Sequence, residues 1–364
     1  MIILSDSEDR FHNLTTPGSY EWTYFDGLSE DAEWAFVAIW FRGCPMSPYY
    51  TAAIDRYLRN PDTQPPRAED YCAFSFSLYH RGRSVFRMLE ELPAGRFSTS
   101  SGTADARLGT NAVRGETSRN RPASYMIYID AKSGTGGSRV VGDIEITSRG
   151  QDLGGLGESY TEPAGNSSDG WPDAHFWVPA ALDATFTARL DLWRLARSTR
   201  KARFHGRAYH DRNFGTGPLH HLLADWHWGR VHSGRHAFVY FAVTPDDPGI
   251  SPFRHLLLLD EGRLLHHAAD FELSESPRKG HWAGLPYAKE IQGDSRAGLA
   301  FRLAARAGLD SGPFYHRLLS DIHVTGNALP VIDAPGITEF LRPSRLGVAA
   351  FRPFVKFRVK RGKG

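Results

Sequence analysis

The stretch WAFVAIW at residues 34–40 carries no charge and decides the fold class. A short apolar run rich in aromatic and branched side chains is typical of a strand that is largely buried. Residues 124–130, SYMIYID, have a similar character, whereas residues 73–79, AFSFSLY, alternate apolar with small polar side chains. Since alternate residues of a strand face opposite sides, the second pattern indicates a sheet with one buried face. The three segments predict a β protein.

Further strands are expected where the pattern recurs, at residues 139–146, 185–190, 237–243, 255–259 and 354–359. Helical periodicity is scarce, and only residues 47–60 and 219–226 suggest short helices. Two stretches of low hydrophobic content, residues 93–122 and 148–171, are expected to be long loops. Glycine-rich residues 134–137 lie between two strands, so they predict a hairpin turn and not a phosphate-binding loop. Many strands without alternating helices indicate an all-β architecture.

The length of 364 residues exceeds that of one ordinary core and favours two domains. The simplest division places one β domain at residues 1–198 and a second β-barrel domain at residues 199–364. Hydrophobic residues make up 41% and charged residues 23% of the chain, which is typical of a globular protein and not of a disordered one.

The net charge of +2 argues against a nucleic-acid partner, which would need clustered Lys and Arg. The basic residues near the C-terminus, between Lys356 and Lys363, fit a solvated tail or a transient contact with anionic lipid. The N-terminus turns acidic at once, and no stretch approaches 18 apolar residues. Cys44 and Cys72 are expected to be buried free thiols. We therefore expect a cytoplasmic protein, peripheral at most to the inner membrane surface.

A dense polar and aromatic cluster spans residues 205–215 and 225–230. On an extended strand, Tyr209 and Asp211 share one face and His210 points to the other. Trp226 and Trp228 share a face in the same way. The same patterns also suit a capped turn and a packed core, since Asp and Asn cap turns and paired Trp residues fill cores.

A second cluster at residues 171–179, WPDAHFWVP, places His175 and Trp177 on one face of an extended segment. Two such strands would build one pocket wall. No metal is expected, because no known ligand spacing matches the histidines of this region, which are His205, His210, His220, His221 and His227. Motifs of nucleotide hydrolysis, zinc proteolysis and the α/β-hydrolase elbow are absent from the sequence.

Several motifs, in order, resemble those of bacterial carotenoid 1,2-hydratases, also called hydroxyneurosporene synthases. Residues 17–31 resemble the opening of that family, and residues 41–50 resemble its Ser-Pro-Tyr-Tyr run after an apolar strand. The family's Tyr-x-Asp-x-Asn-x-Gly element matches residues 209–215, and its Trp-x-Trp pair matches Trp226 and Trp228. The resemblance covers most of residues 17–243 and implies two lipocalin-like antiparallel β-barrel domains with no cofactor.

The resemblance also implies which residues act. The family's His-x-Trp and Tyr-x-Asp pairs fall on the four residues expected to be catalytic, His175, Trp177, Tyr209 and Asp211. Substrate-binding roles are expected for Trp226, Trp228, Tyr49, Tyr50, Asn213 and His210. This chain departs from the family in having His210 where Leu is usual and Gly229 where Ser is usual. These departures point to the wider superfamily, which includes cyclases that catalyse Diels–Alder reactions.

Three functions are compatible with this sequence. The first is acid-initiated hydration of a terminal double bond of an acyclic carotenoid, with Asp211 as a carboxylic acid kept protonated by burial. His175 would then bond to Asp211 or deliver the water, and Trp177 and Tyr209 would face the carbocation. The second is a cyclase or pericyclase that folds a polyene or polyketide-derived substrate. The third is a binding module for a hydrophobic small molecule, without catalysis.

Overall fold

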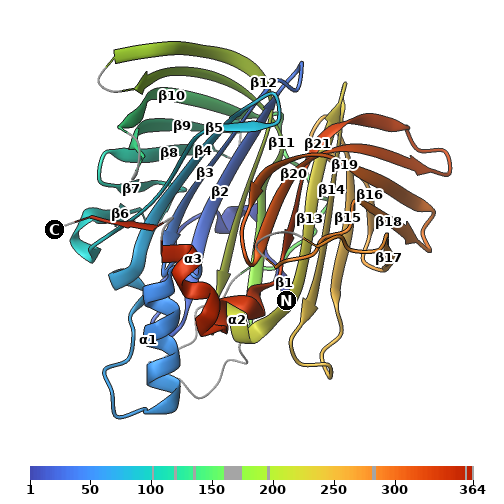
Figure 1. Cartoon of the computed structure of the whole chain (residues 1–364). Helices are drawn as coiled ribbons and strands as arrows, with labels where there is room; N and C mark the ends of the chain where they lie inside the picture. The colour runs from blue at the N-terminus through green and yellow to red at the C-terminus, as the bar shows by residue number, and fades with distance from the viewer. Residues whose placement is uncertain are drawn as a thin grey trace.

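The computed structural model describes residues 1–100, 102–118, 121–133, 137–159, 174–194, 197–280, 284–356 and 359–362. Two curved and mainly antiparallel sheets lie side by side, and three short helices cluster at one end of them (Figure 1). The first sheet is a half-barrel in which β1 pairs with β11 beside the path β22-β5-β4-β3-β2-β12-β11-β10-β9-β8-β7-β6. The second sheet is nearly closed, in the order β16-β15-β14-β13-β21-β20-β19-β18-β17. The all-β fold expected from the sequence is confirmed.

The first sheet takes its strands from the N-terminal part of the chain and one from the C-terminus. They are β1 (Ile2–Ile3), β2 (Tyr20–Ser29), β3 (Trp34–Arg42), β4 (Cys72–His80), β5 (Arg83–Leu92), β6 (Phe97–Thr99), β7 (Ala106–Leu108), β8 (Asn111–Ser118), β9 (Arg121–Lys132), β10 (Ser138–Ser148), β11 (His175–Arg194), β12 (Arg197–Gly215) and β22 (Val359–Arg361).

The second sheet is continuous in sequence. It contains β13 (Leu223–Ser233), β14 (His236–Pro245), β15 (Phe253–Asp260), β16 (Arg263–Ala268), β17 (Phe271–Glu275), β18 (Glu290–Ser295), β19 (Leu299–Ser311), β20 (Tyr315–Gly326) and β21 (Ile332–Leu341). The helices are α1 (Pro48–Arg59), α2 (Leu219–Leu222) and α3 (Arg352–Lys356), with 3₁₀ turns at η1 (Asp6–Glu8), η2 (Ala68–Tyr71), η3 (Ala94–Arg96), η4 (Pro343–Gly347) and η5 (Ala349–Phe351).

Strand β3 explains why residues 34–40 are apolar without interruption. Val37 and Ile39 belong to a core that lies between the two sheets, together with residues of β13, β14 and β21. Phe36 and Trp40 point the other way, into the core enclosed by the first sheet. A strand buried on both faces has no position for a polar side chain. A third core fills the second sheet, so the molecule has one core inside each sheet and one between them.

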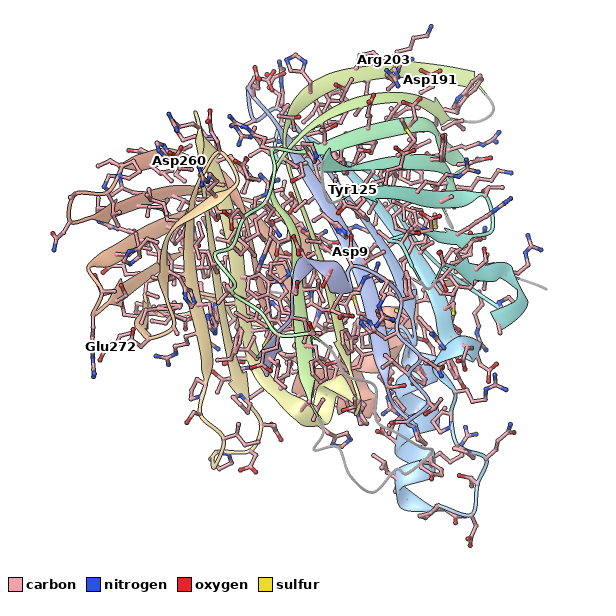
Figure 2. The ribbon with its side chains drawn as sticks, turned by 180° about the vertical axis from the view of Figure 1, so that it is seen from behind. Asp9, Tyr125, Asp191, Arg203, Asp260 and Glu272 are labelled. Atoms are coloured by element: carbon pink, nitrogen blue, oxygen red, sulfur yellow. The ribbon has the colours of Figure 1, made fainter. Side chains whose placement is uncertain are left out.

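The sheets change between Gly215 and Leu223, and not at residue 198 as the sequence suggested. Residues 197–215 stay in the first sheet because β12 pairs with β11 from Arg197 to Gly215 and with β2 from Gly206 to Gly215. The C-terminus then returns to the first sheet, where β22 runs parallel to β5. Figure 2 shows the reverse side, with Asp191 and Arg203 near the end of the long β11–β12 hairpin and Glu272 at the outer edge of the second sheet.

Other local expectations met mixed outcomes. The helix after Ser47 is confirmed as α1, with the Ser47 hydroxyl accepting from the backbone amides of Tyr49 and Tyr50. The loop expected at residues 93–122 is wrong, because this stretch folds into η3 and the short strands β6, β7 and β8. The strand expected at residues 354–359 is also wrong, since Phe354 lies in α3. The turn expected at residues 134–137 lies largely outside the described residues, as do residues 160–171 of the loop expected at residues 148–171. The described residues 149–159 of that loop contain turns, bends and isolated bridges but no strand.

Candidate functional site

Asp211 lies on β12 at the face that looks toward the second sheet, and it is buried. Its Oδ2 atom accepts two hydrogen bonds, from the Tyr209 hydroxyl at 2.7 Å and from the Trp177 indole nitrogen at 2.9 Å. The Tyr209 oxygen accepts in turn from the indole nitrogen of Trp228 at 3.3 Å. This contact fixes the direction of the chain, since an indole N–H only donates. Because Oδ2 takes two donors, a proton on the Asp211 carboxyl belongs on Oδ1.

Burial raises the pKa of Asp211 to about 7, although the hydrogen bonds from Tyr209 and Trp177 and the charge of His210 work in the opposite direction. Desolvation disfavours the charged form of a carboxyl more than these contacts favour it. A large fraction of Asp211 is therefore a neutral carboxylic acid at neutral pH. Such an acid in an apolar wall is suited to give a proton to a substrate.

His175 contacts this carboxyl group indirectly, through the side chain of Asn213. The Nε2 atom of His175 donates to the side-chain oxygen of Asn213 at 3.2 Å. The Nδ1 atom of His175 accepts from the Tyr20 hydroxyl at 2.7 Å. Burial lowers the pKa of His175 to about 3, so the ring is neutral. Asn213 also contributes a hydrogen bond that favours ionised Asp211. His175 thus reaches Asp211 through Asn213, and the direct bond expected from the sequence belongs to Trp177.

A cavity of about 40 Å³ lies in front of Asp211 and Asn213, between the two sheets. Its aromatic walls come from both: Trp22 and Tyr24 from β2, and Trp226 and Trp228 from β13. Trp177 and Tyr209, which the sequence suggested would face a carbocation, contact Asp211 and are not among the residues that line this cavity. Trp177 instead stacks on Phe241 with ring centroids 4.8 Å apart.

A second cavity of about 80 Å³ adjoins the first and shares five of its lining residues, Ile39, Phe41, Met46, Tyr315 and Arg317. It continues between β4 and β5 of the first sheet and residues 310–315 of the second. The two cavities together form one line of apolar space with the acid at one end. A larger hollow of about 480 Å³ over β7–β9 is open to solvent and lies away from this acid.

Sequence reasoning missed the opposite wall. Arg317 on β20 and Glu339 on β21 line the cavity, with the Arg317 Nε atom 2.7 Å from Glu339 Oε1. Both lie in the last third of the chain, where the family resemblance was only general. The sequence signal that could have indicated this wall is the charge of Glu339 among mainly apolar neighbours. Only the register of the strands shows that Glu339 lies opposite Arg317 and Trp228.

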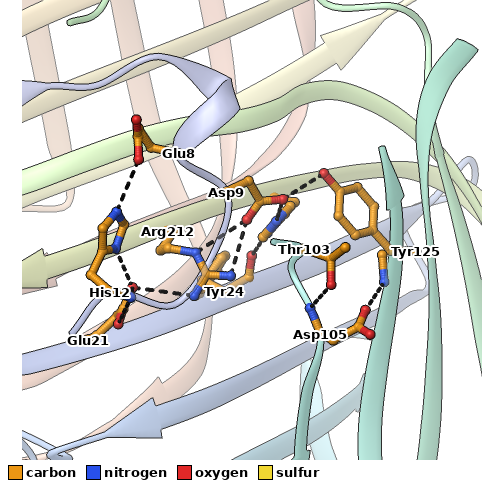
Figure 3. A network of polar contacts seen from close by, with 11 residues as sticks. Glu8, Asp9, His12, Glu21, Tyr24, Thr103, Asp105, Tyr125 and Arg212 are labelled. Carbon is orange, nitrogen blue, oxygen red and sulfur yellow. Dashed lines mark hydrogen bonds and ion pairs between the residues drawn. The ribbon is translucent and has the colours of Figure 1, made fainter. Parts of the chain in front are cut away.

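His210 lies on the other side of β12, as its position in the strand predicted. Its ring stacks on Phe25, and its nitrogens contact the Tyr24 carbonyl at 2.9 Å and the Asp9 carboxylate at 3.0 Å. Figure 3 shows Asp9 between Arg212 and Tyr125 in this buried network, and Figure 2 places Asp9 beside Tyr125. The substrate-binding role expected for His210 does not fit this geometry, because the ring is turned away from the cavity.

Tyr49 and Tyr50 also lie away from the cavity. Tyr50 is fully buried, donates its hydroxyl to the Ser19 carbonyl at 2.7 Å and stacks on Tyr71. The Tyr49 ring packs under the side chains of Lys356 and Arg361. Of the ten expected site residues, the structure thus brings seven together and leaves Tyr49, Tyr50 and His210 outside the site.

Within the described residues, one group of side chains has the spacing of a metal site. Ligand atoms of Asp55, His220 and His221 lie within 4.8 Å of one another, near the helices and not at the cavity. Asp55 is already paired with Arg352, which supplies the positive charge that a cation would bring. No step of the chemistry below uses this group. Cys44 and Cys72 are free and buried, as expected.

Two of the basic C-terminal residues have partners on β5, where Lys360 pairs with Glu90 and Arg361 with Glu91, each at 2.7 Å. Arg358 and Lys363 lie outside the described residues. Among the helices of the described part of the chain, none has the length and apolar character needed to cross a bilayer.

The family described as carotenoid hydratase CrtC matches residues 38–364. The chain is a member of the carotenoid hydratase family. The match spans both sheets and includes Asp211, His175 and the cavity walls on β13, β20 and β21. The family resemblance inferred from the sequence motifs is confirmed.

One relative is a protein named hydroxyneurosporene dehydrogenase from Chlorobaculum tepidum. It is 29% identical over 99% of this chain and 92% of its own length. An acyclic carotenoid 1,2-hydratase from Thiocapsa roseopersicina is 26% identical over 65% of this chain. The match covers only 50% of that hydratase, so the chain corresponds to about half of it.

Two solved structures share the fold. CghA in complex with Sch210972 aligns over 90% of this chain and 89% of its own, with a TM-score of 0.57 and 11% identity. Kievitone hydratase from Nectria haematococca aligns over 94% of this chain and 93% of its own, with a TM-score of 0.53 and 14% identity. These likenesses confirm the two-domain lipocalin-like fold.

Both departures from the family pattern have a local explanation. A Cβ atom added at Gly229 would lie 2.5 Å from the Tyr240 ring and 2.8 Å from the Thr338 methyl group, so a Ser would not fit here. His210 contacts the buried Asp9 carboxylate through a ring nitrogen, and a Leu side chain could not make this contact. The departures therefore reflect packing on both sides of the site and not a change in the cavity.

Proposed function

We propose that this protein adds water to a terminal carbon–carbon double bond of an acyclic carotenoid or a related isoprenoid, without a cofactor. Membership of the carotenoid hydratase family supports the reaction class. The observation that carries the proposal is Asp211, a buried carboxylic acid with a pKa near 7 in the wall of an aromatic cavity.

An isolated alkene accepts water only after protonation, because it offers no polarised group for a nucleophile. Protonation of a terminal trisubstituted double bond gives a tertiary carbocation. Asp211 is the proton donor, with Tyr209 and Trp177 fixing the orientation of its carboxyl group. The rings of Trp226, Trp228 and Tyr24 surround the space where positive charge develops, each contributing up to about 2 kcal/mol when desolvated.

The shape of the site agrees with a long apolar substrate. The two adjoining cavities leave the acid at one end and continue past Phe41 and Met46 toward Leu89 and Phe314. Their volumes of about 40 and 80 Å³ are smaller than the volume of a polyene. Substrate entry in this proposal therefore involves separation of the side chains that meet between the sheets. The two sheets contact each other through side chains here, which permits such a movement.

The test is incubation with neurosporene or lycopene in water enriched in oxygen-18, followed by mass spectrometry. The wild-type protein is expected to give a hydroxylated product that carries the label. Asp211→Asn keeps the shape of the side chain and lacks the proton, so turnover should fall at least about 100-fold. Asp260→Asn, at an exposed ion pair with Arg235, is the matched control and should retain turnover.

Two results would contradict the proposal. A product isomeric with its substrate would indicate a cyclase, and a substrate recovered unchanged after long incubation would indicate a binding module. Unchanged turnover in Asp211→Asn would exclude Asp211 as the proton donor while leaving the reaction itself in place.

A further inference from the structure

A second carboxylate faces the cavity from the other sheet. Glu339 on β21 lies directly opposite Trp228 on β13 and Arg317 on β20, and all three line the cavity that Asp211 lines from β12. On the first sheet, Tyr24 of β2 lies directly opposite Asp211 of β12. The Tyr24 ring contacts the rings of Tyr209 and Trp228 edge-on, at 6.2 and 5.6 Å between centroids. The acid and Glu339 therefore belong to one continuous set of contacts.

Three donors converge on one oxygen of Glu339. The Oε1 atom accepts from Arg317 Nε at 2.7 Å, from the Tyr24 hydroxyl at 3.0 Å and from the Tyr315 hydroxyl at 3.2 Å. Nothing within the described residues donates a hydrogen bond to Oε2. A carboxylate held at one oxygen by a cation and two hydroxyls has its other oxygen available to accept from a water molecule.

The surroundings of the two carboxyl groups differ in the direction that a division of labour requires. Asp211 has neutral donors and apolar walls, which favour its protonated form. Glu339 forms an ion pair with Arg317, whose Nε atom lies 2.7 Å from Oε1. Pairs of titratable groups in contrasting environments are the usual arrangement of an acid and a base in one site.

We propose that Glu339 is the base that binds the attacking water and takes its proton. The inference rests on the proposed hydration. Asp211 gives its Oδ1 proton to the secondary alkene carbon, which leaves a cation on the tertiary carbon. The water oxygen then bonds to that carbon while one water proton moves to Glu339 Oε2. The product gains one hydrogen and one hydroxyl group, and return of a proton from Glu339 to Asp211 through solvent restores the resting state.

The Tyr24 hydroxyl connects Glu339 to a third carboxyl group. It lies 3.0 Å from Glu339 Oε1 and 3.1 Å from Oδ2 of Asp26. Asp26 is fully buried and pairs with Arg230, deeper between the sheets. One hydroxyl hydrogen cannot serve two carboxylates at once, so this geometry is satisfied when one of the two carboxyl groups is protonated.

The experiment separates protonation from water attack. Purified protein is incubated with neurosporene in deuterium oxide, and both the hydrated product and deuterium in recovered substrate are measured. The Glu339→Gln variant keeps Asp211, so it forms the cation and returns it to alkene with deuterium incorporated. We expect its hydration rate to fall about 100-fold while deuterium exchange persists. Asp211→Asn should lose hydration and exchange together.

Two further variants guard the interpretation. Tyr315→Phe removes one of the three donors to Glu339 but leaves the carboxylate, so hydration should fall by less than in Glu339→Gln while exchange stays at the wild-type level. Glu290→Gln breaks a comparable Glu–Arg pair at the surface, with Arg302, and should leave both signals unchanged. Circular dichroism of each variant checks the fold.

The outcomes are distinct. Hydration at the wild-type rate in Glu339→Gln would overturn the role of Glu339. Equal loss of hydration and exchange in a folded Glu339→Gln variant would also overturn it, since Glu339 would then serve only to shape the site. If the wild-type protein shows neither hydration nor exchange, the proposed function itself fails, whatever the variants do.

Discussion

The indole N–H of Trp177 donates to Oδ2 of Asp211 at 2.9 Å, across the pairing of β11 with β12. The Tyr209 hydroxyl donates to the same oxygen, so in the proposed mechanism the proton is carried on the other oxygen, Oδ1. The His-x-Trp and Tyr-x-Asp pairs are thus parts of one arrangement. Trp177 and Tyr209 position the acid, and His175 acts on it through Asn213.

Activity should fall as pH rises through about 7. Asp211 works as an acid only while it is protonated, and burial raises its pKa to about 7. Below pH 7 the carboxyl group is protonated and neutral, and kcat should be constant. Above pH 7, kcat should fall about tenfold per pH unit. His175, with a pKa lowered to about 3, adds no limb between pH 5 and 9. The measurement is kcat for neurosporene hydration between pH 5 and 9, and a flat profile would contradict the role of Asp211.

The same carboxyl group should make the protein less stable at high pH. Its pKa is higher in the folded state than the value of 3.8 that it has when exposed. Its contribution to the free energy of unfolding is fully present below pH 3.8 and is lost as pH rises through 7. Asp211→Asn removes the ionisation, so the variant should resist urea better than the wild type at pH 8, and the difference should shrink at pH 5. Equal unfolding midpoints at pH 8 would indicate that Asp211 is not desolvated.

Trp177→Phe should move the alkaline limb to higher pH. The indole N–H favours the ionised form of Asp211, so its loss raises the pKa of that carboxyl further. A hydrogen bond to a charged group contributes about 1.5 kcal/mol or more, which corresponds to about one pH unit. Phe keeps the stacking on Phe241. The pH profile of kcat measures the shift, and Trp193→Phe, at a partly exposed position on the same strand, is the control.

The first half of the site could be predicted because its residues are close in sequence or carry the family motifs. Alternation along a strand placed Tyr209 and Asp211 together and turned His210 away, and the structure has both. The second half depends on which strand of β13–β21 lies beside which. The pairing of Glu339 with Arg317 and Trp228 follows from sheet order and register, and neither leaves a local pattern in the sequence.

The point at which the chain passes from the first sheet to the second has no local signal for a related reason. Residues 197–215 resemble any other strand, and only their pairing with β2, almost 200 residues earlier in the chain, shows that they close the first sheet. Tyr49 and Tyr50 were expected at the site because of a motif resemblance. In the structure the Tyr50 hydroxyl donates to the Ser19 carbonyl and holds helix α1 in place. A motif resemblance does not distinguish this packing role from substrate binding.

His175 and Asn213 should behave as one unit in kinetics. His175 Nε2 donates to the Asn213 side chain, and the His175 ring packs edge-on against Trp226 at 5.1 Å between centroids. His175→Ala and Asn213→Ala should each lower kcat/KM about 10- to 100-fold, because each loosens the support of Asp211. The double variant should lose little more than either single one. Losses that multiply would show that the two residues act independently.

The Asp9–His210 pair should stabilise the fold without affecting the chemistry. Burial opposes the charge of Asp9, but His210 and Arg212 outweigh it and hold the pKa of Asp9 below its usual value of 3.8. His210→Leu, which installs the residue usual in the family, leaves Asp9 with fewer partners and should lower the free energy of unfolding by about 3 kcal/mol. Adding Asp9→Asn to that variant should recover part of the loss, since it removes the buried charge.

The sign of the pH effect provides a second check on this pair. A carboxyl whose pKa is lowered by folding contributes stability above pH 3.8, and this contribution is lost as pH falls below it. The Asp9→Asn variant should therefore lose less stability than the wild type between pH 5 and 3 in urea titrations. His205 lies on the same strand as His210 and forms an exposed pair with Glu30. The control variant His205→Leu should change stability by less than about 0.5 kcal/mol. If His210→Leu were as mild as His205→Leu, Asp9 would not need His210, and the network behind the site would be held by Arg212 and Tyr125 alone.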